Sequence, residues 1–232
     1  MDLIYIFLLV LVGLSLLASL NVNRTFKKYS AFPSSGGFTG ASAARRILDS
    51  KGLAGVSVVP TSGSLTDHYD PRNNTVYLSE SVFNSPSVAA VGVAAHEVGH
   101  AIQYAAGYGP IKLRNAVIPF TNFTSRIAPY LVLAGVLLSS WADKLIILAY
   151  AGLIGYAAAA LFQLFTLFSE FDASGRAIDC LVECGIVGSA EADGSRKVLR
   201  AAALTYVAAM AVSVVQLLRM ISIVTSADRR RR

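Results

Sequence analysis

Long apolar runs dominate the hydrophobic pattern of this chain. Residues 3–20 contain no charged residue and are about as long as a helix that crosses a bilayer. Residues 127–141 and 145–168 are two further runs, and the very short polar turn Ala142-Asp143-Lys144 between them predicts a membrane hairpin. Residues 201–218 are the fourth apolar run. The pattern predicts a mainly α membrane protein with about four hydrophobic helices.

A segment of mixed character lies between the first run and the hairpin. Thr39 or Ser42 caps an expected short amphipathic helix that Gly52 ends. Residues 56–59 and 74–79 have strand composition, and the polar residues 65–73 between them are expected to form a turn. The second strand is a candidate edge strand for an extended substrate, although a simple core strand would look the same in sequence. This segment predicts a small α+β unit.

The α+β unit closes with an apolar helix that carries His96-Glu97-Val98-Gly99-His100. Ser85 or Ser87 is the expected cap, and no proline occurs from residue 87 to residue 109. Histidines four residues apart share one helix face and can hold one zinc ion, while Glu97 reaches the metal-bound water as general base. The alternative is a chance match in which these side chains only satisfy one another in a core.

Composition supports the membrane assignment. The 232 residues are 54% hydrophobic and 15% charged, with a mean hydropathy of +0.56. The net charge of +6 is partly gathered in a C-terminal arginine run. A basic tail beside an apolar helix is typical of a membrane-surface anchor, and no pattern favours nucleic-acid binding. We therefore expect the lipid bilayer as a partner and no nucleic acid.

Five segments follow from these patterns. They are an N-terminal transmembrane helix (1–22), an α+β catalytic unit (23–110), a membrane hairpin (111–168), a third-ligand helix and loop (169–198), and a C-terminal hydrophobic helix with a basic tail (199–232). Within the fourth segment, residues 189–197 are expected to form a polar loop. Cys180 and Cys184 are expected to be reduced thiols, with a Cys-x-x-x-Cys zinc site as the weaker alternative.

The charges flanking the first helix set the expected orientation. Arg24, Lys27 and Lys28 follow it, which places Asp2 outside and the catalytic unit in the cytoplasm. Four spanning helices would then leave the arginine tail outside, against the same rule. Either the last helix does not fully span or the orientation is reversed, and Arg219 favours a last helix that is partly surface-lying or packed on protein.

A catalytic zinc site needs a third protein ligand. Glu170 is our choice, because it stands where the hairpin returns to the metal-helix side, at the expected head of the next helix. Glu183, Glu191, Asp172 and His68 remain alternatives at this point.

Several motifs occur in an order that resembles the YugP-type neutral zinc metallopeptidases of bacteria. They are an N-terminal membrane helix, segments 66–72 and 95–103, a membrane hairpin, and segments 170–174 and 201–209. The layout is also similar to the HtpX-type membrane proteases, whose third zinc ligand comes from a Glu-x-x-Ala-Asp motif. Glu170 to Ala173 match its first four positions, but Ser174 replaces the final aspartate, and Asp172 or Asp179 is the candidate substitute.

The resemblance implies a zincin-like, gluzincin-type membrane endopeptidase with one zinc per chain held by His96, His100 and Glu170. Glu97 would be the base, and His68 or Arg176 the oxyanion donor. His68 could equally stabilise its turn, and Arg176 could simply pair with Asp172. The implied partners are a protein or peptide substrate, membrane-bound or misfolded, and the bacterial inner membrane. A homo-oligomer, and a non-hydrolytic zinc-dependent membrane scaffold, remain alternatives.

Overall fold

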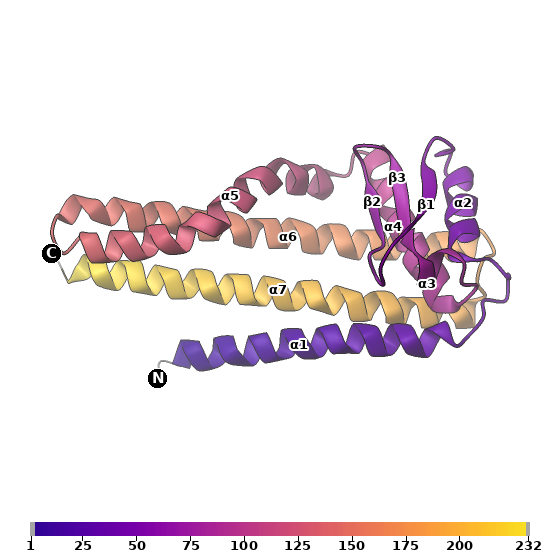
Figure 1. The fold of residues 1–232 in the computed structure, drawn as a ribbon, viewed down its shortest axis with the longest axis horizontal. Coiled ribbons are helices and arrows are strands. Elements are labelled where there is room, and N and C mark those ends of the chain that lie inside the picture. Colours follow the sequence, from indigo (N-terminus) through magenta and orange to yellow (C-terminus); the bar gives the residue numbers. More distant parts are fainter. Residues whose placement is uncertain (1–2, 231–232) are drawn as a thin grey trace. The chain divides into compact units, whose positions relative to one another are not determined.

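The computed structural model describes residues 3–230, apart from the side chain of residue 122. The chain is mainly helical and divides into two units (Figure 1). We call Met1–Leu16, Lys112–Leu167 and Tyr206–Arg232 the helical unit, and Leu17–Ile111 with Phe168–Thr205 the α/β unit. Asp2 and the last two arginines of the tail, on which the expected orientation drew, lie outside the described residues.

The α/β unit begins much as its sequence pattern predicts. Helix α2 (Gly40–Ser50) is capped by the Thr39 hydroxyl, which accepts from the Ser42 amide, and Gly52 follows it with a positive φ of 71°. The other elements wholly in this unit are β1 (Ser57–Thr61), β2 (His68–Asp70), β3 (Thr75–Ser79), α3 (Glu80–Phe83) and α4 (Val88–Ala105). The expected α+β segment between the first helix and the hairpin is therefore present.

The sheet differs from the prediction in its central strand. Its order is β1-β3-β2, with β1 parallel and β2 antiparallel to β3. Strand β3 thus has both edges paired, and the hypothesis that residues 74–79 form a free edge for substrate is wrong. Its side chains at Val76 and Leu78 are fully buried, as suits a central strand.

Strand β2 lies inside the segment expected to be a turn. Only three residues pair, and the last of them, Asp70, forms an ion pair with Arg72, so the segment has the polar composition of a turn. The Tyr69 ring packs edge-on against Tyr104 of α4, with centroids 5.4 Å apart. Tertiary packing, rather than local alternation, therefore selects the extended conformation here.

The core of the α/β unit lies between α2, α4 and the sheet. Helix α4 packs on α2 and on strands β2 and β3. Its buried side of small and branched residues joins Ile47, Leu48, Val76 and Leu181 in one cluster. The helix begins at Ser87, whose hydroxyl accepts from the Ala90 amide, as predicted. The core thereby fixes both the start and the rotation of the helix that carries His96 and His100.

Among residues 3–230, three helices are long and apolar enough to cross a membrane, where the sequence suggested about four. The first is α1 (Leu3–Ser30) and the third is α7 (Ser189–Arg229). The second spans Asp143–Glu183 and consists of the short η1 (Asp143–Leu145) followed by α6 (Ile146–Glu183). The remaining apolar stretch, Phe123–Leu138, is shorter and belongs to α5 (Gly109–Leu138), which contains Pro119 and Pro129 in its interior. Helices α5 and α6 approach closely through small residues, since a Cβ at Gly152 would stand 2.7 Å from the Ala128 carbonyl oxygen.

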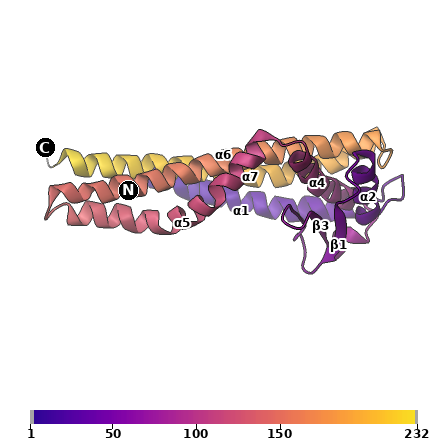
Figure 2. The same cartoon turned by 90° about the horizontal axis from the view of Figure 1, so that it is seen from above.

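Two predicted breaks are absent from the long helices. Helix α6 runs unbroken through residue 170 (Figures 1 and 2), so Glu170 lies inside a helix and not at the head of a new one. Residues 189–197, predicted as a polar loop, form the first turns of α7. Ser195 is fully buried there and donates to the Val88 carbonyl oxygen at 2.9 Å, while the charged residues face outward. The polar composition therefore marks an exposed helix face.

Candidate metal centre

His96 and His100 lie one turn apart on α4. The spacing places both rings on one face, with centroids 4.8 Å apart and ring planes nearly perpendicular. The helix around them is apolar and mostly buried, and it ends before Gly107, whose φ is positive. Two imidazoles on so apolar a helix need polar partners, which come from α6 and from Gln103 of α4 itself.

Glu170 of α6 meets both imidazoles. Its Oε2 lies 3.2 Å from Nε2 of His96, and its Oε1 lies 3.6 Å from Nε2 of His100. One potential ligand atom from each residue lies within 4.8 Å of the others. The side chains are only 14%, 12% and 4% exposed. The three residues singled out from the sequence are thus brought together from two helices far apart in the chain.

The approach of the two helices depends on Gly99, inside the motif. A Cβ at this position would stand 2.6 Å from the Ala173 carbonyl oxygen of α6, closer than real side chains come. Glycine therefore lets the α4 backbone touch α6 only one turn from Glu170. Without this contact, the carboxylate could not reach both Nε2 atoms.

The outer nitrogens of both imidazoles have partners of their own. Nδ1 of His96 lies 3.1 Å from Oγ of Ser174, and Nδ1 of His100 lies 3.0 Å from Oε1 of Gln103. An amide oxygen only accepts, so Nδ1 of His100 carries the hydrogen and Nε2 presents its lone pair. Outer hydrogen bonds of this kind orient the imidazoles of metal-ligating histidines.

Gln103 links His100 to a carboxylate. Its side chain is fully buried, and its Nε2 donates to the Ser169 carbonyl oxygen at 2.7 Å and to Oδ2 of Asp172 at 2.8 Å. The Ser169 hydroxyl donates to Oε1 of Gln103 at 3.1 Å. Asp172 also binds Nε of Arg176 at 2.6 Å, which is the expected i,i+4 pair.

The final aspartate of the related motif is a serine in this chain, and both imidazoles have other polar partners. Ser174 itself contacts His96, while Asp172 reaches His100 through the Gln103 amide. Sequence reasoning missed Gln103 and Ser169. The available signal was a polar Gln103 on an apolar helix, three residues after His100.

Glu97 lies beside His96 and is only 8% exposed. Burial raises its pKa above the usual value, the two imidazoles oppose this, and the carboxylates of Glu170 and Asp67 add to it. Burial lowers the pKa of His100 and is the largest single effect, but the interactions with Glu170, Glu97 and Gln103 together outweigh it, so the net shift is upward. Glu97, the two imidazoles, Glu170 and Asp67 therefore share one electrostatic environment.

The other candidates from the sequence lie in different surroundings. His68 is exposed on β2, where its Nδ1 lies 2.8 Å from the Thr66 carbonyl oxygen and its ring stacks on Tyr77. Glu183 pairs with Lys51, and Glu191 accepts from Ser35 and the Gly188 amide. Cys180 and Cys184 are free thiols. Within residues 3–230, His96, His100 and Glu170 are the only grouped metal-binding side chains.

Comparison with known proteins is consistent with this geometry. Residues 4–225 match the family described as "Putative neutral zinc metallopeptidase". The chain belongs to this family. It is also 48% identical over 221 residues to "Putative membrane protease YugP" of Bacillus subtilis (strain 168), a match that covers 95% of this chain and 96% of the relative. No solved structure matches significantly.

Zinc is accordingly the cofactor of this zinc metallopeptidase homologue, and the three residues fit it. Two ligand atoms each about 2 Å from a tetrahedral zinc ion are about 3.3 Å apart. The observed separations from Glu170 to the two Nε2 atoms, 3.2 and 3.6 Å, are close to this value. Two imidazoles and one carboxylate are also a common donor set of catalytic zinc, and they leave a fourth position for water.

The close approach at Gly99 gives a first prediction. Gly99→Ala should force α4 and α6 apart, lower zinc occupancy of the purified protein, and cost about 1–3 kcal/mol of unfolding free energy. Metal analysis and denaturant titration measure the two effects. Gly175→Ala is the matched control, because a Cβ on that α6 residue meets nothing within 4 Å. Full zinc in Gly99→Ala would refute the argument.

The Gln103 contacts give a second prediction. Gln103→Leu preserves approximate volume but removes the acceptor for His100, and should weaken zinc binding about 10–100-fold. Chelator competition measures the dissociation constant, and Gln163→Leu in the apolar part of α6 is the control. The zinc-free protein's unfolding should be recorded as well. A loss of stability with unchanged zinc affinity would show that Gln103 is only a packing residue.

Proposed function

We propose that the chain is a zincin-like membrane endopeptidase in which His96, His100 and Glu170 hold one zinc ion and Glu97 is the general base. This proposal rests on one observation: the Nε2 atoms of both histidines and the Glu170 carboxylate lie close together, beside the buried Glu97. The class corresponds to gluzincins, in which the third ligand is a glutamate from a later helix. The family and the related membrane protease support the reaction type.

Bound zinc would supply a polarised water as nucleophile and a positive charge near the peptide carbonyl. The protein supplies proton transfer. Glu97 accepts the proton of the attacking water and then donates it to the leaving amine. Ser174 and Gln103 hold the imidazoles at Nδ1 so that both Nε2 atoms keep facing Glu170.

His68 and Arg176 are the two residues that the sequence suggested as oxyanion donors. The role of His68 as oxyanion donor stays a prediction from the sequence. In the structure its ring contacts Thr66 and Tyr77 on an exposed strand. Arg176 is engaged by Asp172, and its guanidinium carbon lies 5.7 Å from the Tyr108 ring centroid. The ion pair is therefore the role of Arg176 that we favour.

The base assignment is tested with two substitutions in the full-length protein. Glu97→Gln should retain zinc while hydrolysis of unfolded casein falls about 10²–10⁴-fold, because proton transfer is lost. Glu170→Ala should lose zinc itself. Glu80→Gln, on the exposed surface of α3, is the control. Near wild-type hydrolysis by Glu97→Gln would overturn the mechanism.

The alternative function is a zinc-dependent scaffold that binds partner proteins without hydrolysis. It predicts intact zinc and no cleavage of any peptide by the wild type. A buried carboxylate beside the metal ligands favours the enzyme, since a structural zinc site closes its fourth position and needs no base. Membrane or misfolded proteins are the proposed substrates. Because small membrane proteases often associate, a homo-oligomer is a further proposal. Light scattering of the protein in detergent tests it.

We place the metal centre on the cytoplasmic side of the bacterial inner membrane. Arg24, Lys27 and Lys28 follow the apolar part of α1, and Arg196, Lys197 and Arg200 precede that of α7. Both basic clusters belong to the α/β unit, and positive residues favour the cytoplasm.

Cysteine accessibility tests this orientation. On a Cys180→Ala, Cys184→Ala background, Lys197→Cys should react with a membrane-impermeant maleimide only after spheroplasts are opened. Ser140→Cys, in the turn between α5 and α6, should react in intact spheroplasts. The opposite labelling pattern would reverse the orientation.

A further inference from the structure

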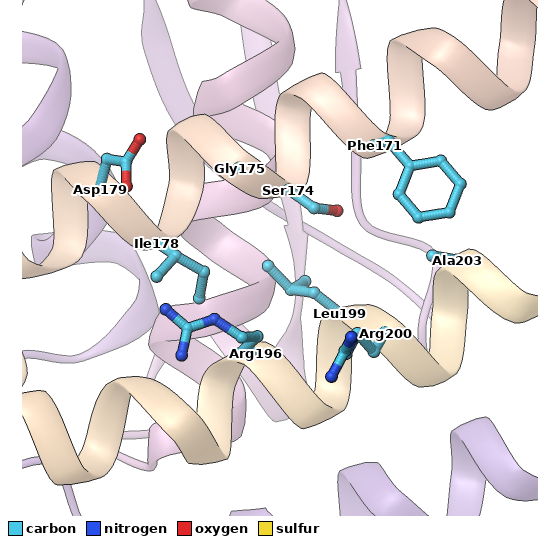
Figure 3. A pocket seen from close by; sticks show the side chains of 9 residues that line it. All are labelled: Phe171, Ser174, Gly175, Ile178, Asp179, Arg196, Leu199, Arg200 and Ala203. Carbon is cyan, nitrogen blue, oxygen red and sulfur yellow. The ribbon is translucent and has the colours of Figure 1, made fainter.

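A cavity of about 310 Å³ lies between α6 and α7, wholly within the α/β unit. Figure 3 shows the side chains of both helices around it. Its walls combine apolar groups with two guanidinium groups, one carboxylate and one hydroxyl: Phe171, Ser174, Gly175, Ile178, Asp179, Arg196, Leu199, Arg200 and Ala203. It is distinct from the group of metal-binding side chains, although Ser174 belongs to the surroundings of both.

The cavity opens where the apolar runs of both helices meet polar sequence. Phe171 follows the end of the run at residue 168 by three residues, about 4.5 Å along a helix. Arg200 directly precedes the run that begins at residue 201. In a bilayer, this boundary coincides with the lipid headgroups. The exposed Phe171 ring, half accessible, then stands beside the acyl chains.

Two hydrogen-bond donors face the cavity without acceptors of their own. Arg200 is exposed and forms no ion pair with any residue from 3 to 230. Ser174 accepts from Nδ1 of His96 once Nε2 of that ring is a metal ligand, which leaves the Ser174 hydroxyl proton free to donate. This second donor rests on the proposed zinc ligation, whereas Arg200 does not. Together they suit an oxyanion.

The carboxylates near the cavity do not cancel this charge. Asp179 lines the end remote from Phe171, eight residues and about 12 Å further along α6 (Figure 3). Asp193 pairs with Arg196 at 2.6 Å. Because the helices are antiparallel in Figure 3, Arg200 lies toward the Phe171 end and Arg196 toward Asp179. The membrane-proximal end therefore keeps an unpaired cation.

We propose that this cavity binds the phosphate headgroup of an anionic phospholipid. Arg200 and the Ser174 hydroxyl donate to the phosphate, and the lipid chains leave the cavity past Phe171 and Ala203. Basic pockets between membrane helices on the cytoplasmic side are a recognised arrangement for such headgroups. The cavity is not a substrate subsite, since Ser174 touches the imidazole nitrogen that faces away from Glu170.

The test titrates the full-length zinc-loaded protein, in a neutral detergent, with dioleoyl phosphatidylglycerol. Native mass spectrometry counts bound lipid, and dioleoyl phosphatidylcholine is the zwitterionic comparison. Arg200→Gln should weaken phosphatidylglycerol binding about fivefold, the factor expected for one basic residue at an anionic surface. Lys197→Gln is the matched control, because it removes the same charge from α7 outside the cavity.

Gly175→Leu provides a variant that fills the cavity without changing charge. A Cβ there meets nothing within 4 Å, and leucine is a better helix former than glycine, so folding should be preserved. It should lose the selectivity for phosphatidylglycerol over phosphatidylcholine. Millimolar inorganic phosphate should compete only weakly, because it lacks the chains. Equal displacement by phosphate would identify a free anion as the ligand and overturn the lipid assignment.

Other results would also refute the proposal. If Arg200→Gln and Gly175→Leu bound phosphatidylglycerol like the wild type, the proposal would be wrong. It would also be wrong if Lys197→Gln lost as much phosphatidylglycerol binding as Arg200→Gln, because general surface charge would then explain the effect. Zinc content is measured on the same samples and should not change in either cavity variant. Lipid selectivity that persists in zinc-free Glu170→Ala would support the proposal through Arg200, the donor that does not depend on zinc, and would separate this site from the metal centre.

Discussion

The backbone contact between α4 and α6 at Gly99 is the constraint on which the metal centre depends. A helix with ordinary side chains along this face would stand off its neighbour, and a glutamate side chain could then not reach imidazoles on both turns. Here the missing Cβ allows Ala173 to come close, and Glu170 one turn earlier spans both Nε2 atoms. Glycine at the fourth position of the motif therefore has a packing role that the histidine spacing alone does not reveal.

The hydrogen bonds behind the imidazoles follow from the same helix contact. Ser169, Asp172 and Ser174 all project from the part of α6 that α4 approaches, and each has a polar partner on α4. Leaving Gln103 or either Nδ1 unpaired in so apolar an environment would cost about 1–3 kcal/mol per group. The polar network is thus required by burial, and through Gln103 it also selects the tautomer of His100 whose Nε2 can bind metal.

Some of this arrangement could be predicted from the sequence because it depends on local periodicity. The spacing of His96 and His100, the Ser87 cap and the apolar runs all express helix geometry within a few residues. Glu170 was reachable by combining the short hairpin turn with a family resemblance. The prediction that it heads a new helix was wrong, since residues 169–174 have no breaker and simply continue α6.

The features that sequence reasoning missed are those set by contacts distant in the chain. Strand β2 exists because β3 and Tyr104 lie beside it, and residues 189–197 are helical because Ser195 and Ala192 have buried places to occupy. Gln103 resembles any polar residue near a helix end until Asp172 and Ser169 are seen around it. Local composition does not indicate which distant residues a segment will contact.

The continuity of α6 joins the metal centre to the membrane boundary. One helix carries an apolar run that ends at residue 168, the metal-facing Glu170 two residues later, and Ser174 one turn beyond. Glu170 therefore lies within about 3 Å, along the helix, of the level where hydrocarbon gives way to headgroups. A site at this level can act on peptide segments that emerge from a bilayer. The Ser174 hydroxyl lines the cavity proposed for a lipid phosphate and also contacts the outer nitrogen of His96, so the two proposed sites share this group.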